Sequence, residues 1–159
     1  MSERIEVSKE IAAPPEAVDA AITDVTRMGQ WSPECFACEW QEGSEGPAVG
    51  AVFDGQNRNG AKEWTGQGTV TEAEPGRRFA VECSMYGFHY STWGYEIEPT
   101  ASGSRVTEWT QDFRPDDVLT MSVQISGVAG RADRQLSAER NRRGMSQTLE
   151  RLAQALEGH

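Results

Sequence analysis

The feature that most constrains this chain is a series of six strand-like runs, joined by short turns, that fills its middle. Apolar and polar side chains alternate along these runs, and glycine, proline and asparagine separate one run from the next. We place the six strands at 35–41, 49–57, 62–73, 78–86, 90–98 and 104–113. Because such short turns join neighbouring strands that run in opposite directions, the sequence predicts an antiparallel meander.

One further strand and two short helices are predicted before the meander. Residues 4–11 alternate apolar and polar side chains, which is the pattern of a half-buried strand. Pro15 suits the first turn of a helix that we expect to run to Thr23. Asp24 is a favourable N-cap, so a second short helix is expected from Asp24 to Gly29.

A long helix is predicted after the meander, from Arg131 to Glu157. Its apolar residues recur every three or four positions and therefore share one face. This apolar stripe consists of Met145, Leu149, Leu152 and Leu156. Towards the N-terminal end the stripe continues through Asn141, Ala138 and Arg134. We therefore expect one end of the helix to seal a core and the other end to face a wetter space.

Length and charge limit the classes of protein that the chain can represent. A chain of 159 residues has the size of one domain with its own core, so we treat 1–159 as a single domain. The net charge of −10, with no compensating Lys/Arg run, disfavours nucleic acid and anionic lipid as partners. No apolar run approaches the roughly 20 residues of a membrane-spanning helix, and the N-terminus lacks a signal-peptide pattern. We expect a cytoplasmic protein without membrane insertion, as a monomer or a weak homodimer.

The three cysteines, Cys35, Cys38 and Cys83, leave at least one thiol unpaired, which suits a reducing compartment. Cys35 and Cys38 form a C-x-x-C motif without a second cysteine pair or a nearby histidine, so we predict no metal site. In an extended strand, positions i and i+3 point to opposite faces, which favours two separate structural thiols. A redox role for the pair stays open. The sequence lacks a phosphate loop and a dinucleotide-binding glycine motif, so no cofactor is expected.

Strand alternation predicts which side chains share a face of the sheet. The groups that fall together are Trp64 with Gly66, Gly68 and Val70; Phe79 with Val81, Cys83 and Met85; Trp93 with Tyr95 and Ile97; and Thr107 with Trp109, Gln111 and Phe113. If all four groups face the long helix, the aromatics either fill a solid core or line a pocket. Glycines such as Gly94 and Gly144 each cost their element roughly 0.5–1 kcal/mol relative to alanine, and we take them to make room for a pocket.

Seven segments, spread over nearly the whole chain, resemble one group of proteins. They are IAAPPEAVDAAITD, MGQWSPEC, VGAVFDGQNRNG, TEAEPGRRFA, WGYEIEP, RVTEWTQDF and NRRGMSQTLERLAQALE. The resemblance is to the START-like (SRPBCC) superfamily, in its group of polyketide cyclases, dehydrases and lipid-transport proteins. It implies an α+β helix-grip fold, in which a curved antiparallel sheet of about seven strands wraps around a long C-terminal helix, with two short helices after the first strand.

Similarity to the aromatase/cyclases of aromatic polyketide pathways implies roles for particular residues. The matched positions are Trp31 and Phe36 at a cavity mouth, Trp64, Trp93 and Trp109 on its walls, and Thr148 on the long helix. Those cyclases carry an arginine on the fourth strand that polarises polyketide carbonyls, whereas this chain reads NGAKEW there. Lys62 and Arg58 are candidate substitutes, although lysine lacks the forked geometry of arginine. Glu34, close to the expected mouth, is a candidate base.

We therefore predict a protein that binds a small hydrophobic, polycyclic aromatic metabolite of the polyketide kind, in bacterial secondary metabolism. Two alternatives stay open: a polyketide aromatase/cyclase or dehydratase, and a self-resistance protein that sequesters a reactive metabolite such as an enediyne. The predicted ligand-binding residues are Trp31, Phe36, Trp64, Met85, Trp93, Tyr95, Trp109, Gln111, Arg134, Asn141, Met145 and Thr148. No catalytic residue is assigned beyond the candidates Lys62, Glu34 and Arg58.

Overall fold

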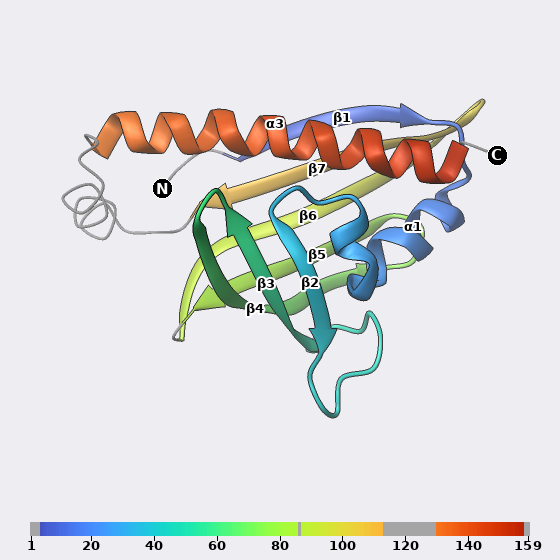
Figure 1. Cartoon of the computed structure of the whole chain (residues 1–159). Coiled ribbons are helices and arrows are strands. Elements are labelled where there is room, and N and C mark those ends of the chain that lie inside the picture. Colours follow the sequence, from blue (N-terminus) through green and yellow to red (C-terminus); the bar gives the residue numbers. More distant parts are fainter. Residues whose placement is uncertain (1–3, 86, 113–129, 158–159) are drawn as a thin grey trace.

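A curved antiparallel sheet and a long C-terminal helix dominate the structure, as Figure 1 shows. This computed structural model describes residues 4–85, 87–112 and 130–157, with the side chains of 59, 62 and 130–137 outside the description. The helix-grip fold expected from the sequence is confirmed. Phe113, which the sequence places at the end of the last strand, lies outside the described residues.

The N-terminal elements match the predicted ones to within one or two residues at each end. They are β1 (Ile5–Ile11), α1 (Pro15–Thr23) and the 3-10 helix η1 (Val25–Gln30). Pro15 occupies the first turn of α1, where a missing backbone N–H costs no helical hydrogen bond. Asp24 caps η1, because its carboxylate accepts a hydrogen bond from the Thr26 backbone N–H at 3.2 Å.

Seven strands form one sheet. The strands after η1 are β2 (Cys35–Trp40), β3 (Val52–Asn59), β4 (Lys62–Glu74), β5 (Arg78–Met85), β6 (Phe88–Thr100) and β7 (Gly103–Asp112). The strand order is β1-β7-β6-β5-β4-β3-β2, and every pair is antiparallel. Consecutive strands from β2 to β7 are neighbours, so the predicted meander is confirmed, and β1 and β2 are the two edges.

The helix α3 spans Gly130–Glu157 and packs over β1, with smaller contacts to β7 and α1. In Figure 1 it lies alongside β1, and the sheet curves away beneath it towards β3 and β2. The predicted apolar stripe supplies its core contacts: Met145, Leu149 and Leu152 are buried, and Leu156 packs against the core. Neither α3 nor any other described helix is long and apolar enough to span a membrane.

The inner face of the sheet, towards α3, is identified by the cross-strand pair Ile97–Val106, whose side chains are both buried. Residues an odd number of positions away point to the opposite, outer face. Trp109 therefore lies on the outer face opposite Gly94, and Gln111 lies there with it. The prediction that Trp109 and Gln111 face the helix was wrong, because β7 turns its small and acidic residues, not its aromatic one, towards the interior.

Candidate ligand-binding site

Aromatic and polar side chains meet on the inner face where β6 pairs with β7. Trp93 pairs with Thr110 and Tyr95 pairs with Glu108, so all four point to the same side of the sheet. We call this group of four residues the inner site. Trp93 and Tyr95 are only half-buried, although they lie on the inner face. Aromatic walls with a few polar groups beside them are typical of ligand-binding sites.

Glu108 is the unusual member of the inner site. The residue is 6 % exposed, and its Oε2 has no hydrogen-bond partner within the described part of the chain. The Tyr95 hydroxyl donates a hydrogen bond to the carboxyl, but burial outweighs that contact and raises the pKa of Glu108 to about 8. Burial also raises the pKa of Tyr95 well above its usual value, so the tyrosine keeps its proton. At neutral pH Glu108 is therefore largely protonated and offers an O–H donor.

Neighbouring polar atoms already have partners. Thr110 Oγ1 donates to the Thr92 carbonyl at 3.0 Å, and Trp93 Nε1 donates to Ser91 Oγ at 3.1 Å. The Ser91 hydroxyl in turn donates to the sulfur of Cys83. Among the described residues of this part of the sheet, Glu108 is thus the buried group that retains unused hydrogen-bonding capacity.

Glu108 and Thr110 were not among the predicted site residues, because the aromatic Trp109 was expected on the interior face of the strand. A signal for the correct face was present in the same strand. The apolar Val106 alternates with Glu108 and Thr110, whereas the face of Trp109 also carries the charged, exposed Arg105. Weighing the whole alternating set, rather than its largest member, would have selected the inner face.

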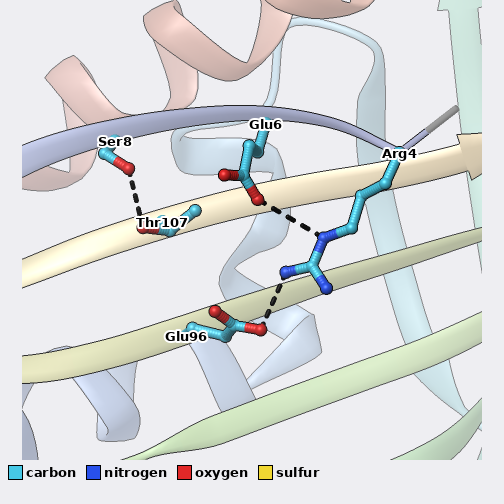
Figure 2. Close-up of polar contacts among 5 residues, drawn as sticks. All are labelled: Arg4, Glu6, Ser8, Glu96 and Thr107. Carbon is cyan, nitrogen blue, oxygen red and sulfur yellow. Dashed lines mark hydrogen bonds and ion pairs between the residues drawn. The ribbon is translucent and has the colours of Figure 1, made fainter.

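Trp109 belongs to a cluster of contacts on the outer face. Its ring lies against Gly94, where an added Cβ would come within 2.4 Å of the ring atom Cε2. The Arg4 guanidinium lies over the ring, with its central carbon 4.2 Å from the ring centroid. Figure 2 shows that Arg4 also pairs with Glu6 at 3.4 Å and with Glu96 at 2.7 Å. Trp109 is therefore part of a surface cluster and does not line the interior.

Three of the glycines expected to make room for a pocket receive side chains of the protein itself, whereas a Cβ at Gly144 would meet only the Pro33 side chain at 3.7 Å, an ordinary contact. A Cβ at Gly68 would come within 2.3 Å of the Phe53 ring, and one at Gly66 within 2.9 Å of the Tyr90 hydroxyl. Gly94 accommodates an aromatic ring in the same way. For Gly66, Gly68 and Gly94 the inference to empty space was wrong, because neighbouring aromatic side chains fill the room that these glycines leave.

The two aromatics expected at a cavity mouth have different surroundings. Trp31 is 2 % exposed and belongs to the core, with the Arg27 guanidinium 4.9 Å from its ring centroid. Phe36 is 39 % exposed and packs against the Arg58 guanidinium, 4.5 Å from its ring centroid. Arg58 also forms an ion pair with Glu63, with Nε and Oε1 3.0 Å apart. Trp31 thus has a core position, and Phe36 and Arg58 lie together on the surface.

Trp64 lies on the inner face of β4, opposite Asn57, and donates a hydrogen bond to the Tyr90 hydroxyl. Trp64 and Phe36 both line an open groove of about 190 Å³. The groove is lined by Phe36, Gln56, Asn57, Glu63, Trp64 and Thr65. Ligand pockets typically measure about 300–1,000 Å³, so this groove by itself is small for a polycyclic molecule. Met85, another predicted ligand contact, is half-buried at the end of β5.

Of the candidate catalytic groups, Glu34 has a perturbed pKa. Burial raises the pKa of its carboxyl, and the Arg140 guanidinium of α3 opposes that shift. Glu34 therefore lies within electrostatic reach of α3, while its backbone carbonyl accepts a hydrogen bond from the Arg58 N–H at 2.8 Å. The side chains of Lys62 and Arg134 lie outside the described residues, and the backbone of Lys62 begins β4 at the β3–β4 turn.

The remaining predicted ligand contacts lie on α3. Met145 is 1 % exposed, so it belongs to the packed part of the helix. Thr148 is buried, and its hydroxyl donates to the Gly144 carbonyl at 2.9 Å, which satisfies the hydroxyl within the helix. Asn141, one turn towards the N-terminus, is half-buried. Of the two predicted polar contacts on α3 whose side chains are described, Thr148 is satisfied within the helix and Asn141 is partly exposed.

The structure also corrects the prediction for the C-x-x-C motif. A β-bulge in β2, where Phe36 has no partner on β3, adds one residue between the two cysteines. Cys35 and Cys38 therefore point to the same face, and their sulfur atoms lie 3.0 Å apart. The two thiols are not separate. Within the described ranges, no group of three or more His, Cys, Asp or Glu side chains is arranged to hold a metal ion.

Comparison with known proteins assigns the chain to a class and then to a family. The fold is that of small α+β domains in which a sheet grips a C-terminal helix. Residues 2–157 match the family model described as polyketide cyclase / dehydrase and lipid transport, and the chain belongs to that family. Among curated proteins, none matches the sequence.

Solved structures share the fold over nearly the whole chain. The Polyketide_cyc-like protein Cgl2372 from Corynebacterium glutamicum is 30 % identical, with 100 % of this chain and 98 % of that chain covered and a TM-score of 0.63. Protein MLL2253 from Mesorhizobium loti is 19 % identical, with coverages of 98 % and 97 % and a TM-score of 0.69. The di-domain ARO/CYC StfQ from the steffimycin biosynthetic pathway is 13 % identical, with 96 % of this chain and 49 % of that chain covered and a TM-score of 0.75.

Proposed function

We propose that the chain binds a small hydrophobic, aromatic molecule of the polyketide kind against the inner site. The observation that carries this proposal is Glu108, a buried carboxyl beside the partly buried Trp93 and Tyr95, with one oxygen that has no hydrogen-bond partner among the described residues. Buried polar atoms nearly always have a partner, so an unpaired one marks a place where a ligand or water is expected. Membership of the polyketide cyclase / dehydrase and lipid transport family supports the same class of ligand.

The groups of the inner site have distinct parts in this binding. Trp93 and Tyr95 present aromatic surface on which a planar ring system can stack. Protonated Glu108 donates a hydrogen bond to a carbonyl or phenolic oxygen of the ligand, as un-ionised carboxylic acids do in other apolar sites. The Tyr95 hydroxyl holds the carboxyl by its other hydrogen bond. This arrangement favours a neutral keto or phenol form over an enolate, because the four residues that make up the inner site include no cation to balance an enolate charge.

A polyketide cyclase or dehydratase is the second candidate, and the pKa of Glu108 favours it. A carboxyl with a pKa of about 8 can give a proton to a carbonyl or a departing hydroxyl and regain it near neutral pH. In this interpretation Glu108 polarises the carbonyl in place of the arginine that the aromatase/cyclases carry on the fourth strand and that this chain lacks at the matching position.

Titration with a hydroxyanthraquinone, a stable tricyclic stand-in for an aromatic polyketide, tests the proposal by quenching of tryptophan emission. We expect one molecule to bind per chain. Glu108→Leu should weaken binding about tenfold, or about 1.4 kcal/mol, because it removes a hydrogen bond in a buried setting. The matched variant Glu96→Leu, on the outer face of β6, should leave the affinity unchanged.

Recovery of the probe and of a linear polyketide analogue by chromatography separates the two candidate functions. A carrier returns both molecules unaltered, whereas a cyclase or dehydratase returns the linear analogue in altered form. Absence of binding, or an equal loss of affinity in Glu108→Leu and Glu96→Leu, would contradict the assignment of the inner site.

A further inference from the structure

We propose that Cys35 and Cys38 form a redox-active dithiol that is converted reversibly to a disulfide by exchange with small-molecule disulfides such as oxidised glutathione. The inference concerns a covalent modification site at the β2 edge of the sheet. It does not depend on the ligand proposed for the inner site, and it rests on the geometry that β2 imposes on its two cysteines.

The pairing register explains why the two sulfur atoms meet. Phe36 is the extra residue of the bulge, so the strand regains its pairing at Cys38, which lies opposite Gly55. The two Sγ atoms are 3.0 Å apart, well inside the usual separation of unbonded sulfurs. Gly55 adds to this arrangement, because a Cβ there would lie 3.5 Å from each Sγ and the glycine leaves that space clear. A bond between the sulfurs therefore needs little movement of the strand.

The two thiols differ in acidity and in access. The Cys38 thiol donates a hydrogen bond to the Cys35 sulfur, which lowers the pKa of Cys35 and raises the pKa of Cys38. Desolvation and the charge of Glu34 oppose the shift at Cys35, but the hydrogen bond outweighs them. Cys35 is half-buried at the first position of an edge strand, whereas Cys38 is 5 % exposed. Cys35 is thus the more acidic and more accessible thiol, which makes it the attacking sulfur and Cys38 the resolving one.

The exchange proceeds in two displacements that balance in atoms and electrons. The Cys35 thiolate attacks one sulfur of the small disulfide, which forms a mixed disulfide and releases one small thiolate. Cys38 then loses its proton to the released thiolate and attacks the Cys35 sulfur, which forms the Cys35–Cys38 bond and releases the second small thiolate. Two electrons pass from the protein to the small disulfide, and an excess of small thiol reverses both steps.

Cys83 serves as an internal control, because it is a third cysteine on a neighbouring part of the same face. Burial raises its pKa to about 12, although the Ser91 hydroxyl donates a hydrogen bond that partly opposes the rise. At neutral pH Cys83 is therefore protonated and is a poor nucleophile. We expect it to stay a thiol under conditions that oxidise the β2 pair.

Tryptic peptide mapping after treatment of the full chain with oxidised glutathione tests the proposal. Cys35 and Cys38 lie in one peptide, 28–58, whereas Cys83 lies in another, 79–105. After acid quenching and alkylation, peptide 28–58 should lack two hydrogen atoms and carry no alkyl group, and peptide 79–105 should be alkylated. Excess reduced glutathione should return peptide 28–58 to its alkylatable form.

Variants separate the attacking thiol from the resolving thiol. Cys38→Ala should stop at a glutathione adduct on Cys35, and Cys83→Ser should behave as the wild type. Loss of the donor in Cys38→Ala should also slow alkylation of Cys35 at neutral pH about tenfold, whereas Cys38→Ser, which keeps a hydroxyl donor, should slow it less.

Two results with the wild-type chain overturn the proposal even if a variant folds poorly. One is the persistence of both thiols in peptide 28–58 under conditions that fully oxidise dithiothreitol. The other is a cross-link between peptides 28–58 and 79–105 as the main product, which would show that Cys83 is a preferred partner and that the bulge does not define the reactive pair.

Discussion

At β6 and β7 the two faces of the sheet each carry a tryptophan and a carboxyl group, but the surroundings of these residues differ. On the outer face, Trp109 lies over Gly94 and beneath the Arg4 guanidinium, which is paired with carboxylates. On the inner face, Trp93 lies beside the buried carboxyl of Glu108, which has one oxygen without a hydrogen-bond partner in the described part of the chain. Neighbouring tryptophans on one sheet thus have opposite surroundings. The outer one completes a set of contacts within the chain, whereas the inner one lies beside a carboxyl oxygen that has no hydrogen-bond partner among the described residues.

The largest effect expected from this difference is a pH dependence of stability that originates on the inner face. Glu108 has a pKa of about 8 in the folded chain, against its usual value of 4.5 once unfolded. As pH rises above 4.5 the unfolded chain loses this proton while the folded chain keeps it, so the free energy of unfolding falls until the pH passes about 8. Because one pKa unit is worth about 1.4 kcal/mol, the loss amounts to several kcal/mol.

Denaturant unfolding of the wild type and of Glu108→Gln, at a series of pH values from about 5 to 9, measures this effect. The variant should have a flatter profile, and the difference between the two profiles isolates Glu108 because every other titrating group is common to both. Parallel profiles would show that burial does not keep the Glu108 carboxyl neutral. The two faces would then not differ in the way that they treat a carboxyl group.

Gly94→Ala should produce the next largest effect, and it acts on the outer face. The new Cβ would lie 2.4 Å from the Trp109 ring, so the ring has to shift away from the sheet. Overpacking of this kind typically costs about 1–3 kcal/mol. Combining it with Trp109→Val should cost less than the sum of the single changes, because the shortened side chain removes the clash. Additive costs in thermal unfolding would contradict the close packing of Gly94 against Trp109.

A pair of conservative tryptophan substitutions compares the two faces in binding. Trp93→Phe should weaken hydroxyanthraquinone binding about fivefold, or about 1 kcal/mol, because it reduces the stacking surface of the inner site. Trp109→Phe should leave the affinity unchanged and lower only the thermal midpoint. The reverse pattern, with Trp109→Phe as the variant that loses the probe, would place the ligand on the outer face.

The elements of the fold could be predicted because their signals are local. Pro15 and Asp24 fix the starts of two short helices through their own chemistry, and the spacing of Leu149 and Leu152 defines a helix face without reference to any other segment. The turns between strands are equally local. Such signals determine which elements form and in what order, and they predicted the meander; the wrapping of the sheet around the helix was implied by the family resemblance.

The site could be predicted only in part, because it depends on pairing between strands. Alternation correctly grouped Trp93 with Tyr95 and separated Glu108 from Trp109, but it does not by itself say which of the two groups on β7 faces inward; the register with β6 places Glu108 inside and Trp109 outside. The bulge in β2 likewise depends on pairing with β3, and one unpaired residue was enough to bring Cys35 onto the face of its partner thiol. A shift of a single residue reverses every side chain that follows it.

The smallest effect is expected from Arg4→Ala, which dissects the outer cluster. The Arg4 and Glu96 side chains are 38 % and 40 % exposed, so their ion pair is worth about 0.2–1 kcal/mol at most. The stacking of the guanidinium on Trp109 adds about 0.5–1 kcal/mol at such an exposed position. Side-chain ordering offsets part of both, so we expect a loss of about 1 kcal/mol in the free energy of unfolding.

Salt separates the two contributions of Arg4, because ions screen an exposed ion pair but leave the contact with the ring. The difference between wild type and Arg4→Ala should therefore shrink in about 1 M salt without vanishing. The uncharged Ser8–Thr107 hydrogen bond, 2.7 Å long on the same face, supplies the matched control, since the cost of Thr107→Val should not change with salt. If the destabilisation caused by Arg4→Ala disappears in salt, the stacking of the guanidinium on Trp109 contributes nothing to stability. Trp109 would then be stabilised only by its packing against Gly94 and its neighbours in the sheet, and the Arg4 contact would not distinguish the outer face from the inner one.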